Sequence, residues 1–165
     1  MTTSIKTSPK ERKLGFRVLF LAMFAIGTGQ TLFIAVLPPY ARGLGLSEVQ
    51  VGFIFSLSAL GWMMMSPFWG RKSDFIGRKS IIILGLLVYA FTTILMGLEF
   101  RLKELGYINL STLFGLLIFT RGCYGFLGSG AHSASMAYVA DRTTENERSG
   151  VMACLLYTSD AADDN

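Results

Sequence analysis

The sequence predicts an all-α protein, a polytopic bundle of transmembrane helices. Three observations indicate this class: long runs without any charged side chain, charges gathered in short clusters between them, and a positive mean hydropathy of +0.49. Charged residues make up only 16% of the 165 residues, whereas a soluble domain carries about a quarter. This composition is atypical of a disordered chain, and two cysteines are too few for a disulfide-stapled secreted fold.

Four apolar segments are long enough to cross a bilayer. Uncharged runs span residues 18–41, 49–70 and 80–98, and a fourth segment over residues 105–140 contains a single charged residue, Arg121. A helix needs roughly 20 apolar residues to cross about 30 Å of hydrocarbon, and helices satisfy their own backbone hydrogen bonds in lipid. The first run is too long for a signal peptide, and three more spans follow it. We therefore expect four spanning helices, the first of which ends at Pro38-Pro39.

Basic residues are concentrated on one side of the predicted membrane. Eleven lie in the N-terminal segment and around residues 70–79 and 141–149, against three in the other two loops. Because loops rich in Lys and Arg stay in the cytoplasm, residues 1–14 are expected to form a cytoplasmic N-terminal segment of a multi-pass protein in the cell (inner) membrane. Topology and the lipid bilayer then explain the pI near 9.2, and no nucleic-acid partner is expected.

The end of the chain is unlike a natural terminus. A fifth apolar segment starts at Gly150 and is interrupted after Ser159 by three aspartates. Ten residues give about 15 Å of helix, which is half a span. We interpret residues 154–165 as the translated scar of a sequencing adapter and not as native sequence, with a short acidic tail as the alternative. Residues up to Ala153 would then be the N-terminal part of a longer protein, whose missing C-terminal portion is its partner.

The segment between the second and third runs carries a distinctive pattern. It reads Gly70-Arg71-Lys72-Ser73-Asp74-Phe75-Ile76-Gly77-Arg78-Lys79. A tight loop is expected here, in which Gly70 and Gly77 can supply positive φ. Asp74 is a lone acid among four bases, so a solvated surface carboxylate is the alternative to a specific role.

This decapeptide resembles the signature loop of the major facilitator superfamily, Gly-x-Leu-Ala-Asp-Arg-x-Gly-Arg-Lys. The matching residues are Gly70, Asp74, Gly77, Arg78 and Lys79, whereas Lys72, Ser73 and Phe75 stand where the family usually has Leu, Ala and Arg. The resemblance implies that the matching residues form a conformational latch. It also implies about twelve helices in two halves that rock around a central cavity, of which residues 15–153 would be the incomplete N-terminal half. Asp141, in a second loop similar to the family's, can pair with the basic residues of segment 70–79.

The fourth apolar segment holds a second motif. An arginine inside a membrane helix should face protein or water, and helical spacing places Arg121, Gly125, Gly128 and His132 on one face. The core Arg121-x-x-x-Gly125 resembles a motif of the superfamily's drug and metabolite proton-antiporter branch, with Tyr124 where Gln is usual. This resemblance implies a role for Arg121 in proton transfer or coupling. A structural ion pair or a hydrogen bond to a carbonyl is the alternative.

Three polar residues are candidates for lining the substrate cavity: Gln30, Tyr124 and His132. Gln30 lies in the Gly-interrupted stretch Gly27-Thr28-Gly29-Gln30-Thr31 of the first run, and such stretches favour transporter binding sites. A packed polar residue is the alternative reading of His132. The first run contains no carboxylate, so if protons drive transport, the titrating acid is expected in the missing portion.

These features together predict a truncated secondary active transporter, a proton-coupled exporter of drugs or other small-molecule substrates. An uncoupled facilitator and a non-transporting membrane sensor on the same fold remain as alternatives. No paired carboxylates, metal-spaced His/Cys cluster or nucleophile constellation indicates an enzyme, and neither a cofactor nor a metal is expected. Residues 1–153 alone are expected neither to transport nor to fold well.

Overall fold

The structure, a computed structural model, is a bundle of long helices. It describes the backbone of residues 9–143 and the side chains of residues 14–143. The elements in chain order are α1 (Pro9–Gly43), α2 (Glu48–Ile76), α3 (Arg78–Glu104), α4 (Leu110–Cys123), the π-helical segment η1 (Tyr124–Gly128) and α5 (Ser129–Arg142). The described residues contain no strand. The prediction of an all-α bundle is confirmed.

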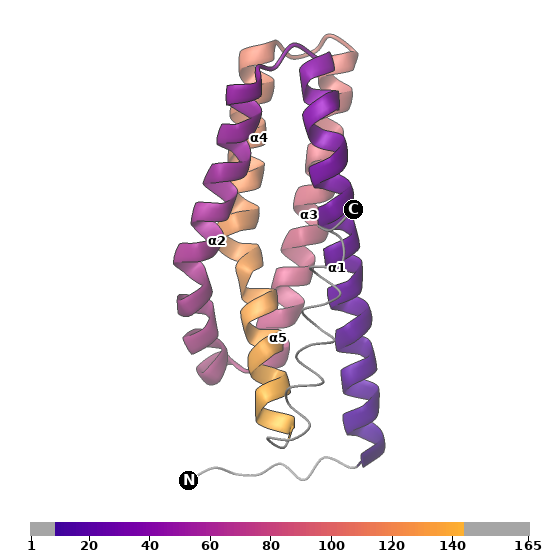
Figure 1. Cartoon of the computed structure of the whole chain (residues 1–165), viewed down its shortest axis with the longest axis vertical. Helices are drawn as coiled ribbons and strands as arrows, with labels where there is room; N and C mark the ends of the chain where they lie inside the picture. Colours follow the sequence, from indigo (N-terminus) through magenta and orange to yellow (C-terminus); the bar gives the residue numbers. More distant parts are fainter. Residues whose placement is uncertain (1–8, 144–165) are drawn as a thin grey trace.

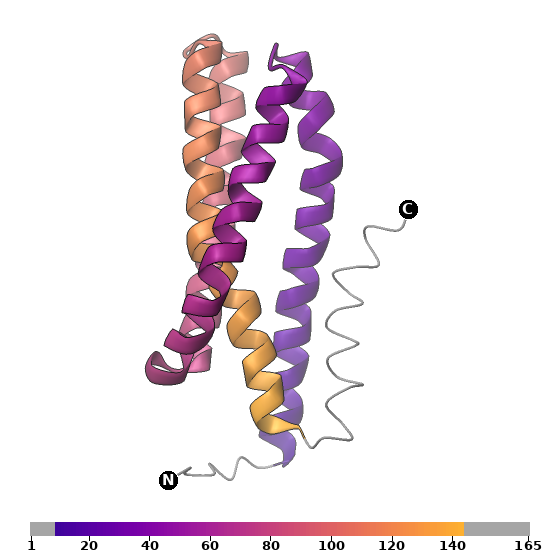
Figure 2. The ribbon, with the colours of Figure 1, turned by 60° about the vertical axis from the view of Figure 1, so that its left-hand side comes forward.

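The helices run up and down, and their connections alternate between the two ends of the bundle (Figure 1). The start of α1, the α2–α3 connection and the end of α5 lie together, and we call this the basic end. The connections around residues 44–47 and 105–109 lie at the opposite end. Figure 2 shows α4, η1 and α5 following one another as a single long helix that changes direction near η1.

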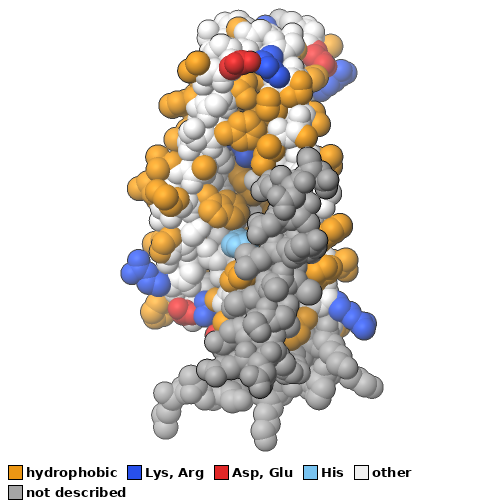
Figure 3. Space-filling view, viewed as in Figure 1, with side chains coloured by type: hydrophobic (Ala, Val, Ile, Leu, Met, Phe, Trp, Pro, Cys, Tyr) orange, Lys and Arg blue, Asp and Glu red, His pale blue; other side chains and the backbone are white. Residues whose placement is uncertain are grey.

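Four helical segments are long and apolar enough to cross a membrane. They are Leu14–Gly43, Glu48–Ile76, Arg78–Glu104 and Leu110–Arg142. Hydrophobic side chains cover most of the length of the visible face, and charged side chains gather toward its two ends (Figure 3). This distribution matches a bilayer, where the apolar band lies in hydrocarbon and charges reach water. The four spans predicted from the sequence are confirmed.

The first span is longer than expected at the opposite end. α1 does not end at Pro38 and Pro39 but continues to Gly43. Proline removes a helical hydrogen bond and disfavours a helix interior. Here packing outweighs that cost, since Leu37 is only 2% exposed and Ala41 is fully buried in an apolar cluster with the other helices. These two side chains hold the last turns of α1 in the bundle.

The expected loop over residues 70–79 is reduced to a single-residue connection. α2 continues to Ile76 and α3 begins at Arg78, so only Gly77 lies between the two helices. Gly77 has a φ of 101°, a conformation that favours glycine. The expectation that Gly70 supplies a second positive φ is wrong, because Gly70 lies inside α2 with helical backbone.

Two apolar clusters lie on either side of the middle of the bundle, one toward each end. The cluster at the opposite end is formed by Leu37, Ala41, Leu46, Val51, Ile54, Met96, Leu113 and Leu117. The cluster at the basic end is formed by Leu19, Trp69, Ile81, Ile82, Ala134 and Val139. Both gather side chains that are far apart in sequence, so together they fix how the helices pack. The polar side chains described below lie mainly between them.

Four predictions fall wholly or partly outside the described residues. They are the N-terminal segment 1–14, residues 144–149 of the loop over residues 141–149, the start of a fifth helix at Gly150, and the boundary between residues 153 and 154.

A β-carbon added to Gly85 of α3 would lie 2.5 Å from the Ala131 Cβ and 2.7 Å from the Ala131 nitrogen of α5. We expect Gly85→Val to push these helices apart and to lower stability by about 1–3 kcal/mol, the usual cost of overpacking. Thermal unfolding of the detergent-purified complete protein measures the loss. Gly97→Val is the matched control on the same helix, because no described atom of another helix lies within 4 Å of its added β-carbon. Equal losses in both variants would contradict this close packing.

Candidate functional site

Arg121 lies on α4 inside the bundle and is 6% exposed. Its guanidinium carbon lies 4.1 Å from the ring centre of Phe33, 5.0 Å from that of Tyr124 and 5.9 Å from that of Phe55. Arg121 Nη1 also donates a hydrogen bond to Gln30 Oε1 at 3.4 Å. Aromatic faces stabilise a cation through their quadrupoles. Side chains from α1, α2 and η1 therefore surround this one charge.

The partners of Arg121 differ from those of a structural ion pair. No carboxylate pairs with Arg121 among the described residues, and its Nε has no hydrogen-bond partner there. Its hydrogen bond goes to the carbonyl oxygen of the Gln30 side-chain amide. The alternative of a structural ion pair is therefore not seen among these residues, whereas the alternative of a hydrogen bond to a carbonyl is met by Gln30. The guanidinium keeps donor capacity that a ligand can use.

A cavity of about 300 Å³ lies between the helices beside this arginine. Its lining draws on every element except α4 and includes Gln30 of α1, Trp62 of α2, Tyr89 of α3, Tyr124 of η1 and His132 of α5. A small hollow lined by Arg121 adjoins it, because Gln30 and Tyr89 line both spaces. The three residues that the sequence analysis named as cavity lining thus all lie on this cavity.

Aromatic rings form one wall of the cavity. Ring centres lie 5.7 Å apart for Tyr89 and Tyr124, 5.7 Å for Tyr124 and Trp62, and 6.1 Å for Trp62 and His132. These separations allow favourable edge and tilted ring contacts. His132 packs against this wall. The sequence analysis did not single out Tyr89 or Trp62, since a lone aromatic residue in an apolar run carries no distinguishing pattern.

Gly125 does not face the cavity. A β-carbon at this position would lie 2.5 Å from the backbone oxygen of Ser58, so the glycine lets η1 approach α2 closely. The prediction of a single face for Arg121, Gly125, Gly128 and His132 is therefore wrong at Gly125. The prediction assumed α-helical spacing throughout, whereas residues 124–128 form a π-helical turn with a different period. Gly128 and His132 do line the cavity.

The π-helical turn is fastened to α2 by a tryptophan. Trp69 Nε1 donates a hydrogen bond to the backbone oxygen of Phe126 at 2.7 Å, and Trp69 is itself 8% exposed. A π-helical turn disturbs the regular backbone ladder, and polar side chains commonly compensate. Trp69 thereby ties the segment that carries Tyr124 to the neighbouring helix.

At the basic end, Arg78 joins three helices. Its guanidinium forms ion pairs with Asp74 of α2 and, at 3.0 Å, with Asp141 of α5. It also donates hydrogen bonds to the Gly70 oxygen at 3.3 Å and to the hydroxyl of Ser73, which is 1% exposed. The predicted pairing of Asp141 with segment 70–79 is confirmed. Asp74 is half-exposed but paired, so it is not simply a solvated carboxylate.

Two other residues that the resemblance assigns to a latch, Gly77 and Lys79, have different positions. Gly77 provides the sharp connection that turns Arg78 back toward α2. Lys79 is exposed on the first turn of α3.

Glu99 is an ionisable residue that the sequence analysis missed. Counting uncharged runs assigns it to the loop after Leu98, but α3 continues to Glu104 and Glu99 is 2% exposed. Thr120 of α4 donates a hydrogen bond to Glu99 Oε1. Helical spacing is the sequence signal that could have identified Glu99 as buried, since Thr92, Met96 and Glu99 share the buried face of α3. A carboxyl group is thus buried in the part of the chain where none was expected.

Comparison with known protein families identifies the family of this chain. The sequence profile of the Major Facilitator Superfamily matches residues 19–158. The chain belongs to the Major Facilitator Superfamily. The resemblance of segment 70–79 to this superfamily is confirmed, and the chain is that of a multi-pass membrane protein. The resemblance of Arg121-x-x-x-Gly125 to a proton-antiporter motif stays a prediction.

Named relatives of this superfamily member include drug-resistance proteins. It is 33% identical over 148 residues to multidrug resistance protein 2 of Bacillus subtilis (strain 168), an alignment that covers 90% of the chain and 34% of that protein. It is 40% identical over 73 residues to quinolone resistance protein NorA of Staphylococcus aureus, which covers 44% of the chain and 19% of NorA. The chain spans about a third of the length of the Bacillus relative.

Tyr124 offers a test of the aromatic surroundings of Arg121. Among the described residues its hydroxyl has no hydrogen-bond partner, so removing the hydroxyl should not cost stability. We expect Tyr124→Phe to leave the unfolding temperature unchanged or slightly higher, and Tyr124→Leu to lower it because the ring over the guanidinium is lost. Thermal unfolding in detergent compares the two variants. A larger loss for Tyr124→Phe than for Tyr124→Leu would refute this assignment.

Proposed function

We propose that this superfamily member is the N-terminal part of a proton-coupled transporter that exports drugs or small solutes by alternating access. The basic end then faces the cytoplasm of a cell whose membrane the helices span. The C-terminal portion of the same transporter supplies the other wall of the transport path. The two drug-resistance relatives support the class of substrate, since their names refer to multidrug and quinolone resistance.

The observation that carries the proposal is the cavity beside Arg121. Its volume of about 300 Å³ lies at the lower end of the range for small-molecule sites, which are apolar with a few polar groups. Its aromatic wall suits flat ring systems, and Gln30 and Arg121 add an amide and a cation. From Gln30 the lining continues toward Met23 of α1 and Met136 of α5. In these helices that direction leads to the basic end.

The opposite end is closed by direct contacts between α1 and α3. The Tyr40 hydroxyl of α1 donates a hydrogen bond to Glu104 of α3, and the Tyr40 ring lies edge-on to Phe100 at 5.0 Å. Glu104 also pairs with Arg101 at 2.9 Å. The lining of the cavity continues toward the basic end, whereas contacts between α1 and α3 close the opposite end. This asymmetry supports an alternating-access cycle.

The latch assignment is part of this proposal. Arg78 links α2, α3 and α5 through Asp74 and Asp141, so breaking these pairs would free the basic end to change shape. Each pair is partly exposed, and such pairs contribute little to stability. Three further residues would support the latch. The Gly70 carbonyl accepts a hydrogen bond from Arg78, Gly77 forms the sharp connection between α2 and α3, and Lys79 adds a neighbouring cation.

Removal of the buried cation tests the transport site. We expect Arg121→Ala to lower pH-gradient-driven efflux of norfloxacin, a quinolone, at least tenfold. The hollow that adjoins the cavity loses its charge, and the rings of Phe33 and Tyr124 lose the cation that they contact. Arg42→Ala is the control, since Arg42 is an arginine at the opposite end with a half-exposed side chain. Uptake of norfloxacin into everted vesicles that contain the complete transporter measures both variants, because an exporter moves its substrate into inverted vesicles. Normal efflux by Arg121→Ala would contradict the site, whereas wild-type efflux that ignores the pH gradient would favour an uncoupled facilitator.

The latch predicts a loss of function without a loss of stability. Asp74→Asn should reduce the efflux rate several-fold while the unfolding temperature in detergent stays close to that of the wild type, because the pair is half-exposed. Glu48→Gln removes another exposed carboxylate, from the pair with Arg42, and should change neither quantity. Unchanged efflux by Asp74→Asn would remove the latch role from this residue.

A further inference from the structure

Glu99 is buried in a setting that does not accommodate a negative charge. One carboxyl oxygen, Oε1, accepts a hydrogen bond from Thr120, and the other, Oε2, is buried without a hydrogen-bond partner among the described residues. Thr120 is itself only 1% exposed. A buried carboxylate without a cation or several donors is costly, so the neutral acid is the favoured form in this conformation.

No charged group among the described residues forms an ion pair with Glu99, and Lys103, one turn further along α3, pairs with no carboxylate there either. On its own helix, Arg101 and Glu104 pair with each other, and Tyr40 of α1 bonds to Glu104. On the α4 side, Arg121 donates to Gln30. α2 has no charged residue between Val49 and Gly70. Within the described chain, Thr120 is therefore the one polar side chain that hydrogen-bonds to this carboxyl group.

The position of Glu99 connects it to the cavity. Thr92, Met96 and Glu99 lie on one face of α3, and Thr92 and Met96 line the hollow that Arg121 also lines. Met96 is thus the side chain on α3 between Glu99 and that hollow. The hydrogen-bond partner, Thr120, immediately precedes Arg121 on α4. A change in the Glu99–Thr120 bond would therefore act directly on the helix that holds the buried cation.

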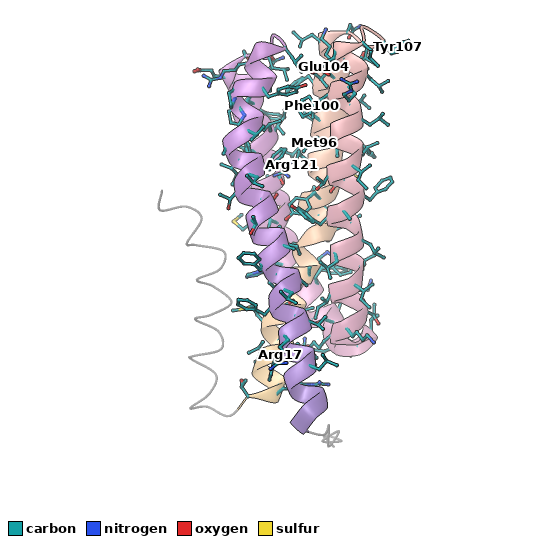
Figure 4. All side chains as sticks on the ribbon, turned by 90° about the vertical axis from the view of Figure 1, so that its right-hand side faces the viewer. Arg17, Met96, Phe100, Glu104, Tyr107 and Arg121 are labelled. Atoms are coloured by element: carbon teal, nitrogen blue, oxygen red, sulfur yellow. The ribbon has the colours of Figure 1, made fainter. Side chains whose placement is uncertain are left out.

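Glu99 also lies close to the opposite end, next in sequence to Phe100, which takes part in the contacts that close it. It is five residues from the end of α3, or about 7.5 Å along the helix. Figure 4 shows Glu104, Phe100, Met96 and Arg121 following one another from that end toward the middle of the bundle. Separation of Tyr40 from Phe100 and Glu104 would open a short path from water to Glu99.

We propose that Glu99 is a proton-binding site of the transporter, loaded from water through the end opposite the basic one and unloaded toward the basic end. When the opposite end opens, water reaches the group and the carboxylate takes up a proton on Oε2. When that end is closed, the neutral carboxyl group accepts the hydrogen bond of Thr120, and the proton leaves to water that enters through the cavity and the hollow beside Met96. No reaction other than this transfer of one proton between water and the carboxyl group is involved. The inference rests on the proposed proton-coupled function and names a residue that would carry the proton.

The test compares uphill transport with exchange in proteoliposomes of the complete transporter. Glu99→Gln keeps the shape and an oxygen acceptor for Thr120 but cannot titrate. We expect it to lose pH-gradient-driven norfloxacin accumulation at least tenfold and to keep exchange of labelled for unlabelled norfloxacin at equal pH within about twofold, since exchange requires no net proton movement. Glu48→Gln, with its side chain 81% exposed, is the matched control and should retain both activities.

The outcomes separate this inference from the proposed function. Wild-type protein that does not couple norfloxacin to the pH gradient would overturn both. A coupled wild type together with normal uphill accumulation by Glu99→Gln would overturn the proton site alone. Loss of both uphill transport and exchange in a folded Glu99→Gln protein would also overturn it, because the residue would then be needed for substrate movement itself.

A second measurement uses the wild-type protein and remains decisive if Glu99→Gln does not fold. Dicyclohexylcarbodiimide modifies protonated carboxyl groups in apolar surroundings, and mass spectrometry of tryptic peptides separates Glu99 from Glu48. We expect an adduct at Glu99 and none at Glu48. The yield of the Glu99 adduct should fall at least fivefold as the pH is raised through the range in which this carboxyl group loses its proton. Absence of the Glu99 adduct, or labelling that is independent of pH, would overturn the proposal.

Discussion

A charge inside a lipid-embedded bundle has to be covered by protein or water, and this requirement shapes the middle of the structure. An arginine at the centre of a membrane helix costs about 2.5–3.5 kcal/mol on insertion scales. Arg121 is accommodated because Phe33 and Tyr124 present ring faces and Gln30 presents an amide oxygen. Those partners come from α1 and from η1, so covering one cation brings the first and fourth spans together.

The same requirement explains why polar groups gather around the cavity in the middle of the bundle. Apolar clusters fill both ends of the bundle, while the middle contains a cavity with an aromatic wall and a buried cation beside it. The π-helical turn places Tyr124 at the junction of that wall and the cation, and Trp69 holds the turn against α2. The cavity is therefore bordered by elements that are each fixed to a neighbour.

Much of this arrangement could be predicted from the spacing of charges along the chain. Uninterrupted apolar runs predicted the four spans, and the basic clusters predicted which connections share an end, because both follow from the solvent. Helix ends were less predictable, since tertiary packing of Leu37 and Ala41 carries α1 past two prolines. The orientation of Gly125 could not be predicted either, because a π-helical turn leaves no mark in hydrophobic periodicity.

Glu99 shows a second limit of prediction from the sequence. A search for uncharged runs stops at the first carboxylate and so assigns that residue to a loop, although α3 continues beyond it. Its burial depends on Thr120, which is 21 residues away in the sequence and carries no signal of its own. Similarly, the role of Ser73 as a partner of Arg78 became visible only when the expected loop proved to be helical.

The account depends on the two ends of the bundle facing opposite sides of a membrane. The most direct test is a cysteine at each end of the bundle in the complete protein, Lys79→Cys at the basic end and Glu48→Cys at the other, in a background where every native cysteine, including Cys123, is replaced by Ser. Labelling of intact cells with a membrane-impermeant maleimide should modify Glu48→Cys at once and Lys79→Cys only after the cells are permeabilised. Labelling of Lys79→Cys in intact cells would contradict the account.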